Sequence, residues 1–264
     1  MSIRAIACLL SLPFLAITSA HSLAALPEQP PAVEIVQIKL GLSNMYLIKA
    51  KRPILVDTGS PKDLPDIERA LAAQGVKLTD ITLVIPTHGH SDHAGAAAQI
   101  RRSSGALIAL GKGDLPMAKA GHNDDLKPTN LMAEILKRFA IDPNYEPFVP
   151  DIVIDGTLDL APWGIRGKAV TMPGHTPGSV VVILDDGRAL VGDMMLGGYF
   201  GGALFPERAG QHYFQADLAA NLENIKTLLK LPIKTFYLGH GGPVTRASVL
   251  KGFDLIDPLQ HERQ

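Results

Sequence analysis

The sequence predicts an α/β fold in which two sheets pack face to face with helices outside them. Apolar runs of strand length alternate with helical patterns through most of the 264 residues, which is typical of layered sheets and helices. The content of 46% hydrophobic and 19% charged residues is that of a globular chain. Histidine and aspartate residues stand at the ends of several apolar runs. We predict one domain over residues 33–264, long enough to bury a core.

Residues 1–25 are predicted to be a signal peptide. Arg4 supplies a positive charge, Ala5–Ile17 is an apolar run, and Ala24 and Ala25 are small residues suited to cleavage. The apolar run is shorter and more broken than a membrane-spanning helix requires, and an uncleaved anchor is the alternative. We expect a periplasmic or secreted protein with no stable membrane insertion after processing.

The charge balance and the cysteine content exclude several kinds of partner and chemistry. The formal net charge is −1, whereas nucleic-acid-binding proteins usually have basic surfaces, so we expect no nucleic-acid partner. Cys8 is the only cysteine and lies in the predicted signal peptide. The processed chain would therefore have no disulfide, no cysteine metal ligand and no cysteine nucleophile. The sequence leaves the oligomeric state open.

The first part of the domain is predicted to be a sheet followed by a helix. Val33–Ile38 alternates between apolar and polar residues, and Met45–Ile48 and Ile54–Val56 continue the sheet. Leu64–Gln74 has the apolar spacing of an amphipathic helix. These elements lead to the strand that carries the densest histidine cluster.

That cluster lies between the buried strand predicted at Ile81–Pro86 and the helix predicted at Ala94–Ile100. The intervening sequence, THGHSDHAG, places four potential metal ligands within six residues: His88, His90, Asp92 and His93. Imidazole nitrogen and carboxylate oxygen are ligands that zinc prefers. Five of the nine histidines belong to this cluster or to two later motifs, which disfavours the alternative of a solvated histidine-rich turn.

The segment from Ala106 to Pro150 has weaker patterns. Ala106–Leu110 is predicted to be a strand, and Asn130–Phe139 to be a helix capped by Thr129. Three residues at helical spacing in or beside it are expected in the core: Leu131, Ile135 and Phe139. The alternative is a substrate groove lined by Met117, Met132 and Phe139. His122, among polar residues, is expected on the surface.

The last part of the domain repeats the pattern of strands that end in a polar residue. The strands predicted there are Ala169–Met172, Val180–Leu184, Ala189–Asp193 and Thr235–Leu238. The turn between the second and third of these predicts a hairpin. His175, Asp193 and His240 stand at or just beyond strand ends, and Leu218–Leu229 is predicted to be a helix.

The H-x-H-x-D-H pattern at His88–His93 resembles that of the metallo-β-lactamase-fold hydrolases. The resemblance extends to PGHTPGS around His175, to Gly192-Asp193 and to Gly239-His240-Gly241-Gly242, and it covers roughly Val33 to Thr245. It implies a four-layer αββα sandwich, which periodicity alone does not predict. It also implies that Asp57, after the third strand, orients metal ligands through hydrogen bonds; the alternative is a turn or helix-entry residue.

The resemblance further implies two Zn²⁺ ions per chain, with iron or manganese as other possibilities. The implied ligands are His88, His90 and His175 for one metal, Asp92, His93 and His240 for the other, and Asp193 as a bridge. Hydroxide held between the metals would attack the carbonyl carbon of a small ester, thioester or lactone. Asp92, which orients that hydroxide and carries a proton to the leaving group, and Asp193 are the catalytic residues implied.

Several relatives of the same fold define the alternative functions. An exported metallo-β-lactamase is the main one, since the cysteine-free subgroup has a similar ligand set, although it generally lacks a bridging aspartate at the position of Asp193. Glyoxalase II enzymes carry a C-terminal helical domain, whereas 24 residues follow His240 here, so glutathione thioester specificity is not expected. An iron-dependent persulfide dioxygenase and a non-catalytic metal-binding protein are further alternatives.

The glycine-rich stretch Gly197–Phe205 is predicted to rim the pocket. Tyr199 or Phe200 would contact an apolar substrate there, and Tyr199 could donate a hydrogen bond to an oxyanion. The alternative is that both aromatic rings pack in the core. The role of His212 is left open, and His212 is not included among the metal ligands.

Overall fold

The computed structural model describes residues 32–138 and 142–259. The predicted signal peptide and Phe139 lie outside these residues, so export and the role of Phe139 stay predictions. Ala32–Gln264 forms one compact unit. Within the described part of the chain, no helix is long and apolar enough to cross a membrane.

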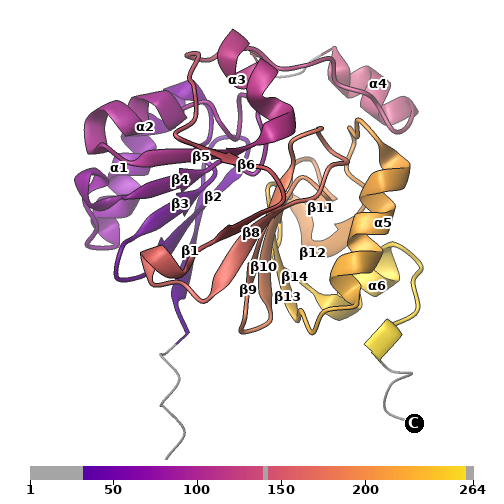
Figure 1. Cartoon of the computed structure of the whole chain (residues 1–264). Helices are drawn as coiled ribbons and strands as arrows, with labels where there is room; N and C mark the ends of the chain where they lie inside the picture. Colours follow the sequence, from indigo (N-terminus) through magenta and orange to yellow (C-terminus); the bar gives the residue numbers. More distant parts are fainter. Residues whose placement is uncertain (1–31, 139–141, 260–264) are drawn as a thin grey trace, which may run out of the picture. The chain divides into compact units, whose positions relative to one another are not determined.

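Two six-stranded sheets form the centre of this unit (Figure 1). The first sheet has the order β1 (Glu34–Lys39), β2 (Asn44–Lys49), β3 (Ile54–Val56), β4 (Leu83–Ile85), β5 (Leu107–Gly111) and β6 (Ile152–Ile154). The second has the order β14 (Val244–Thr245), β13 (Thr235–Leu238), β10 (Arg188–Gly192), β9 (Val180–Leu184), β8 (Gly167–Thr171) and β7 (Thr157–Asp159). Strands β3 to β6 pair in parallel, as do β10 and β13, while the other neighbours are antiparallel.

Alternating side chains of the strands build two apolar layers on the first sheet. In β2, Tyr46 and Ile48 face the second sheet and pack with Val182 and Leu190, while Met45 and Leu47 face the other way. Strand geometry explains this, because successive side chains point to opposite faces. Since both faces of β2 are covered, the strand is apolar on both.

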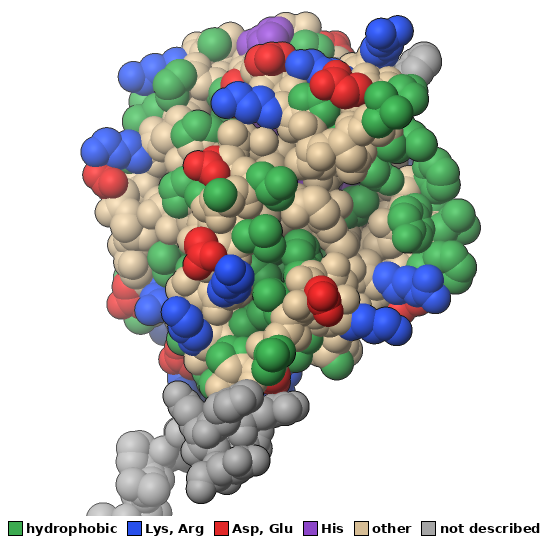
Figure 2. All heavy atoms as spheres, turned by 90° about the vertical axis from the view of Figure 1, so that its right-hand side faces the viewer, with side chains coloured by type: hydrophobic (Ala, Val, Ile, Leu, Met, Phe, Trp, Pro, Cys, Tyr) green, Lys and Arg blue, Asp and Glu red, His purple; other side chains and the backbone are tan. Residues whose placement is uncertain are grey.

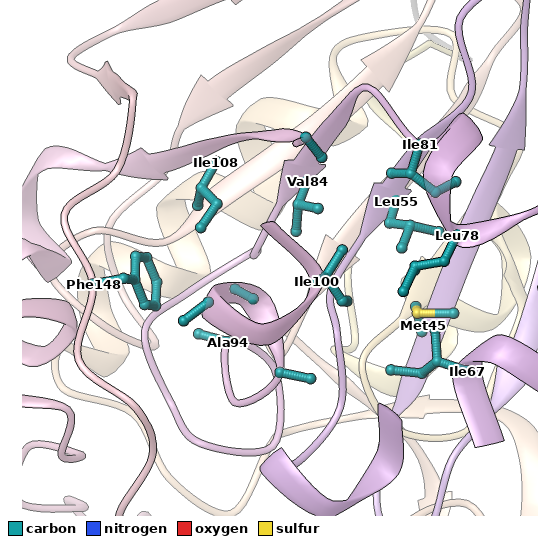
Figure 3. Packing of buried hydrophobic residues seen from close by; sticks show 14 of the residues in the cluster. Met45, Leu55, Ile67, Leu78, Ile81, Val84, Ala94, Ile100, Ile108 and Phe148 are labelled. Carbon is teal, nitrogen blue, oxygen red and sulfur yellow. The ribbon is translucent and has the colours of Figure 1, made fainter. Parts of the chain in front are cut away.

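Helices cover the outer face of each sheet. On the first sheet, α1 (Leu64–Ala73) and α2 (Ala97–Ser104) pack through residues such as Ile67 and Ile100, as Figure 3 shows. On the second, α5 (Leu218–Leu229) and α6 (Arg246–Gly252) do the same through residues such as Ile225 and Val249. Helix, sheet, sheet and helix layers follow one another (Figure 1), which confirms the predicted αββα sandwich.

Most predicted elements lie where the structure has them. The agreement is within a few residues for β1, β2, β4, β5, β8 and β10, and complete for β3, β9, β13 and α5. Several short elements were not predicted: α3 (Leu115–Ala120), β6, β7, β14, α6, β11 (Leu196–Tyr199) and β12 (Leu204–Gly210). Strands β11 and β12 form a separate hairpin out of the stretch predicted as a loop.

The prediction for the helix near residue 131 was wrong in two respects. Helix α4 spans Leu131–Lys137, and its cap is Asn130, whose side chain accepts a hydrogen bond from the Ala133 amide at 2.9 Å. Leu131 is 78% exposed and Ile135 is 49% exposed, so neither belongs to the core. Helical spacing identifies an apolar face of a helix but not the surface that this face meets. Here α4 lies outside both helical layers (Figure 1).

The packing of two isoleucines on helices can be compared directly. Replacing the fully buried Ile100 of α2 by alanine should lower the free energy of unfolding by about 2–5 kcal/mol, because it leaves a cavity in the core. The same replacement at Ile135 of α4 should change it by less than about 0.5 kcal/mol. Urea denaturation measures both variants, and equal losses would contradict the placement of α4.

Candidate metal centre

The histidine-rich loop leaves the end of β4 and folds tightly over itself. The amides of His93 and Ala94 donate to the His90 carbonyl at 3.0 and 2.8 Å. Gly95 closes the turn, and a Cβ atom there would lie 2.1 Å from the Ser91 carbonyl oxygen. Only glycine fits at that position, so the loop can point its side chains inward while its backbone stays compact.

The second sheet brings the other predicted residues to the same place. His175 lies in the loop between β8 and β9, and Asp193 follows β10 directly. Because β10 pairs in parallel with β13, and Gly192 is opposite Leu238, the two strands end side by side. Asp193 and His240 are therefore neighbours although 47 positions separate them (240 − 193).

All seven residues predicted from the sequence meet in one buried cluster. Their potential ligand atoms form groups in which every atom lies within 4.8 Å of the others. These groups are His88–His90–His175, Asp92–His93–His240 and His88–His93–Asp193, with a fourth formed by His175–Asp193–His212. The first two are the ligand sets implied by the sequence, and Asp193 shares a group with members of each.

Each of the five histidines has one ring nitrogen held by an oxygen atom outside these groups. The other nitrogen faces the cluster, an arrangement typical of metal-binding histidines. The pairs are His88 Nδ1 with Thr87 Oγ1 (3.2 Å), His90 Nε2 with Asp124 (2.9 Å), His93 Nδ1 with Asp57 (3.0 Å), His175 Nδ1 with the Phe214 carbonyl (2.9 Å) and His240 Nδ1 with the Leu42 carbonyl (2.8 Å).

Two buried atoms at the centre lack the partners that buried polar atoms normally have. Nε2 of His88 and Oδ1 of Asp193 make no hydrogen bond, and Nε2 of His93 lies 3.5 Å from that oxygen. Ring nitrogens also face each other, at 3.1 Å between His90 and His175. Unpaired buried polar atoms are costly, and bound cations would satisfy them. The residues therefore fit divalent metal ions.

Charge pairing decides the protonation of the two carboxylates. Burial raises the pKa of Asp92, but the His93 and His240 imidazoles hold that pKa well below its usual range. Burial also raises the pKa of Asp193, and again His240 and His93 lower it. Burial lowers the pKa of His240, yet the two carboxylates raise it to about 10. Both carboxylates are thus anionic and suited to divalent cations.

His88 and His175 are kept neutral by their surroundings, whereas burial lowers the pKa of His93 but Asp193 and Asp92 raise it well above its usual range. Burial first, and then the neighbouring His93, lowers the pKa of His88 well below its usual range. Burial is also the largest cause for His175, whose pKa is lowered although Asp193 opposes the shift. Neutral imidazole is the form that binds metals, so His88 and His175 need no deprotonation before binding.

A buried aspartate that sequence reasoning missed joins the two ligand loops. Asp114 accepts hydrogen bonds from the Gly89 amide (2.8 Å), the Gly178 amide (2.7 Å) and the Thr176 hydroxyl (2.7 Å). Burial raises the pKa of its carboxyl, against these hydrogen bonds. The available signal was its position four residues after the predicted strand Ala106–Leu110. Asp124 was also missed as a site residue, His212, whose role was left open, lies in the cluster, and His122 is exposed as expected.

A cavity of about 530 Å³ opens on the cluster. Its apolar lining includes Leu40, Leu42, Leu126, Leu136, Leu196, Phe200 and Phe214. Among the described residues that line it, Lys39 is the only lysine or arginine, and it is exposed.

Phe200 is 68% exposed and Tyr199 54% exposed, so neither packs in the core. Figure 2 shows one face of the molecule, on which hydrophobic patches lie between scattered charges.

The comparison with protein families decides the classification. A model of the metallo-beta-lactamase superfamily matches residues 38–240, most of the chain. The chain belongs to this superfamily. Its members bind divalent metal ions, in agreement with the histidine and aspartate groups of the cluster.

Similar proteins include named hydrolases of this superfamily. The probable metallo-hydrolase YflN of Bacillus subtilis is 26% identical over 259 residues, covering 88% of this chain and 92% of the relative. Hydroxyacylglutathione hydrolase GloC of Haemophilus influenzae is 27% identical over 223 residues, covering 81% and 92%. The subclass B3 metallo-beta-lactamase BJP-1 of Bradyrhizobium japonicum has a TM-score of 0.59 at 20% identity, covering 88% and 91%, which shows a shared fold.

The hydrogen bonds of Asp57 predict its effect on metal binding. Oδ2 of Asp57 lies 3.0 Å from His93 Nδ1, and Oδ1 accepts from the Thr87 amide at 2.6 Å. Asp57→Asn removes one acceptor and should weaken metal affinity by about 10–100-fold, because His93 loses its orienting partner. Chelator competition measures this, with Asp66→Asn on the exposed face of α1 as the matched control. Wild-type affinity in Asp57→Asn would refute the orienting role.

Proposed function

We propose that the protein is a dinuclear zinc hydrolase that cleaves a carbonyl ester or lactone with an apolar group. The observation that carries the proposal is a pair of three-residue groups with Asp193 between them, grouped with members of each, while His88 Nε2 and Asp193 Oδ1 make no hydrogen bond. His88, His90 and His175 would hold one ion, and Asp92, His93 and His240 the other. Nitrogen and oxygen donors without sulfur suit zinc, and three protein ligands per ion are typical of its catalytic sites.

When bound, the two cations supply Lewis acidity, which lowers the pKa of water towards neutrality and polarises a carbonyl group. Asp92 lines the cavity and is ionised, so its carboxylate can accept a proton from attacking water and pass it to the leaving group. The Ser43 hydroxyl donates to the Asp92 carbonyl oxygen at 2.5 Å and holds this residue in place. Asp193, which faces members of both groups, orients the reacting centre.

The lining of the cavity favours a neutral, apolar substrate over an anionic one. β-Lactam antibiotics and glutathione thioesters carry carboxylates, which proteins usually bind with lysine or arginine. Lys39, the one lysine or arginine among the described lining residues, is exposed and offers little for such a group. Leucine and phenylalanine side chains instead present apolar surface to an acyl or aryl group. A thioester without charged groups fits the same description, and β-lactam hydrolysis is the second candidate, since BJP-1 shares the fold.

Metal analysis and two substitutions test the reaction. The protein should contain two zinc ions, lose turnover with a chelator and regain it with added zinc; a single iron would instead indicate the persulfide dioxygenase alternative.

Asp193→Ala and His90→Ala should each lower kcat/KM by about 100-fold or more while the circular dichroism spectrum is unchanged, because each removes a ligand. The exposed His122→Ala is the control. Near-wild-type turnover in either ligand variant would overturn the assignment.

A series of aryl esters with acyl chains of increasing length tests the substrate class. Each added methylene should raise kcat/KM by up to about fourfold until the cavity is filled, because it buries apolar surface. Phe200→Ala should reduce the preference for long chains, whereas Ile256→Ala, at a residue 80% exposed and away from the lining, should leave it unchanged. A cephalosporin cleaved more efficiently than every ester and lactone would establish the second candidate instead.

A further inference from the structure

His212 lies inside the cluster although the two ligand groups are complete without it. It follows β12 and is 5% exposed. Its Nε2 atom is 3.2 Å from Oδ2 of Asp193. Its ring stacks on that of His240, with centroids 5.7 Å apart and planes at 30°, and meets the edge of His175 at 4.9 Å. The His212 ring is thus buried, packs against two other histidine rings, and is within hydrogen-bonding distance of the Asp193 carboxylate.

The backbone of Phe214 determines which nitrogen of His212 carries the proton. The Phe214 amide donates to His212 Nδ1 at 3.2 Å, and an amide N–H can only donate. The Phe214 carbonyl also lies 3.1 Å from Nδ1, and this oxygen has a second partner in His175 Nδ1 at 2.9 Å, whereas the amide depends on His212. Within the described residues the amide has no other acceptor. Nδ1 is therefore the acceptor, which leaves a ring proton on Nε2, the nitrogen that faces Asp193.

We propose that His212 is a positioning residue, which donates Nε2–H to Oδ2 of Asp193 and fixes how this carboxylate faces the two metal groups. His240 Nε2 also lies 3.2 Å from Oδ2, but it belongs to a ligand group and would be used by a metal. His212 is then the donor to Oδ2 that metal binding leaves in place. Oδ1 makes no hydrogen bond and lies 3.5 Å from Nε2 of His93.

A second contact on the same residue supports this assignment. The Gln215 side chain donates to the backbone carbonyl of Asp193 at 3.2 Å. The short segment from His212 to Gln215 thus holds both the side chain and the main chain of Asp193, and through Phe214 it also orients His175. The inference rests on the proposed metal-binding role of Asp193.

Glutamine and methionine at position 212 form a matched pair of variants. They have similar length and flexibility, but only glutamine can donate a hydrogen bond to Asp193. In the full-length zinc-loaded protein, His212→Met should keep two zinc ions, bind one of them about 10–100-fold more weakly in chelator competition, and lower kcat more than it changes KM. His212→Gln should restore most of both losses. His212→Phe, which keeps a flat ring without a donor, should behave like the methionine variant.

The cobalt-substituted proteins separate positioning from direct ligation. If His212 only positions Asp193, the visible absorption of the Co²⁺ protein should keep its intensity in His212→Gln. Loss of one Co²⁺ ion or of that absorption in both His212→Gln and His212→Met would make His212 a ligand and overturn the proposal. Wild-type affinity and kcat in His212→Met would also overturn it. If the wild-type protein binds no metal, the proposed function fails together with this inference, whereas the other outcomes concern His212 alone.

Discussion

The metal centre depends on the oxygen atoms that form a hydrogen bond with one nitrogen of each imidazole, the nitrogen that faces away from the cluster. A histidine side chain can rotate about two bonds. The five rings therefore point into the cluster only if a hydrogen bond to the outer nitrogen fixes each ring. Three of the five partners are side chains, Thr87, Asp57 and Asp124, and two are backbone carbonyls. The cost of burying five rings and two carboxylates is met by this outer set of hydrogen bonds.

The partners lie on loops from distant parts of the chain, which connects the centre to the fold. Asp57 follows β3 with a left-handed φ of 65°, a conformation that aspartate tolerates better than most residues. It reaches the loop after the neighbouring strand β4 because β3 and β4 pair in parallel. Asp114 then ties the loop after β4 to the loop before β9, so one carboxylate spans the junction of the two sheets. The apolar layer between the sheets keeps these loops at a constant separation.

The cavity shows how one metal-binding framework can serve different substrates. The ligand loops belong to the strand ends, whereas the walls come from α4, the β11–β12 hairpin and the loop between β1 and β2. Among these outer elements α4 contributes little to the core, since it buries only Ala133. Its sequence can therefore change with little loss of stability, and the substrate preference depends on these walls and not on the ligand set.

The sequence by itself determined most strands of the two large sheets and the ligand loop, and its resemblance to a known family pointed to the seven residues that converge. Apolar runs and the spacing of His88, His90, Asp92 and His93 are local properties, and the order of the later motifs is visible along the chain. It did not determine the exposure of Leu131 and Ile135, the hydrogen bonds of Asp114 or the place of His212. Those depend on segments distant in sequence that the pairing of β10 with β13 and the packing of the two sheets bring together, and periodicity carries no information about such contacts.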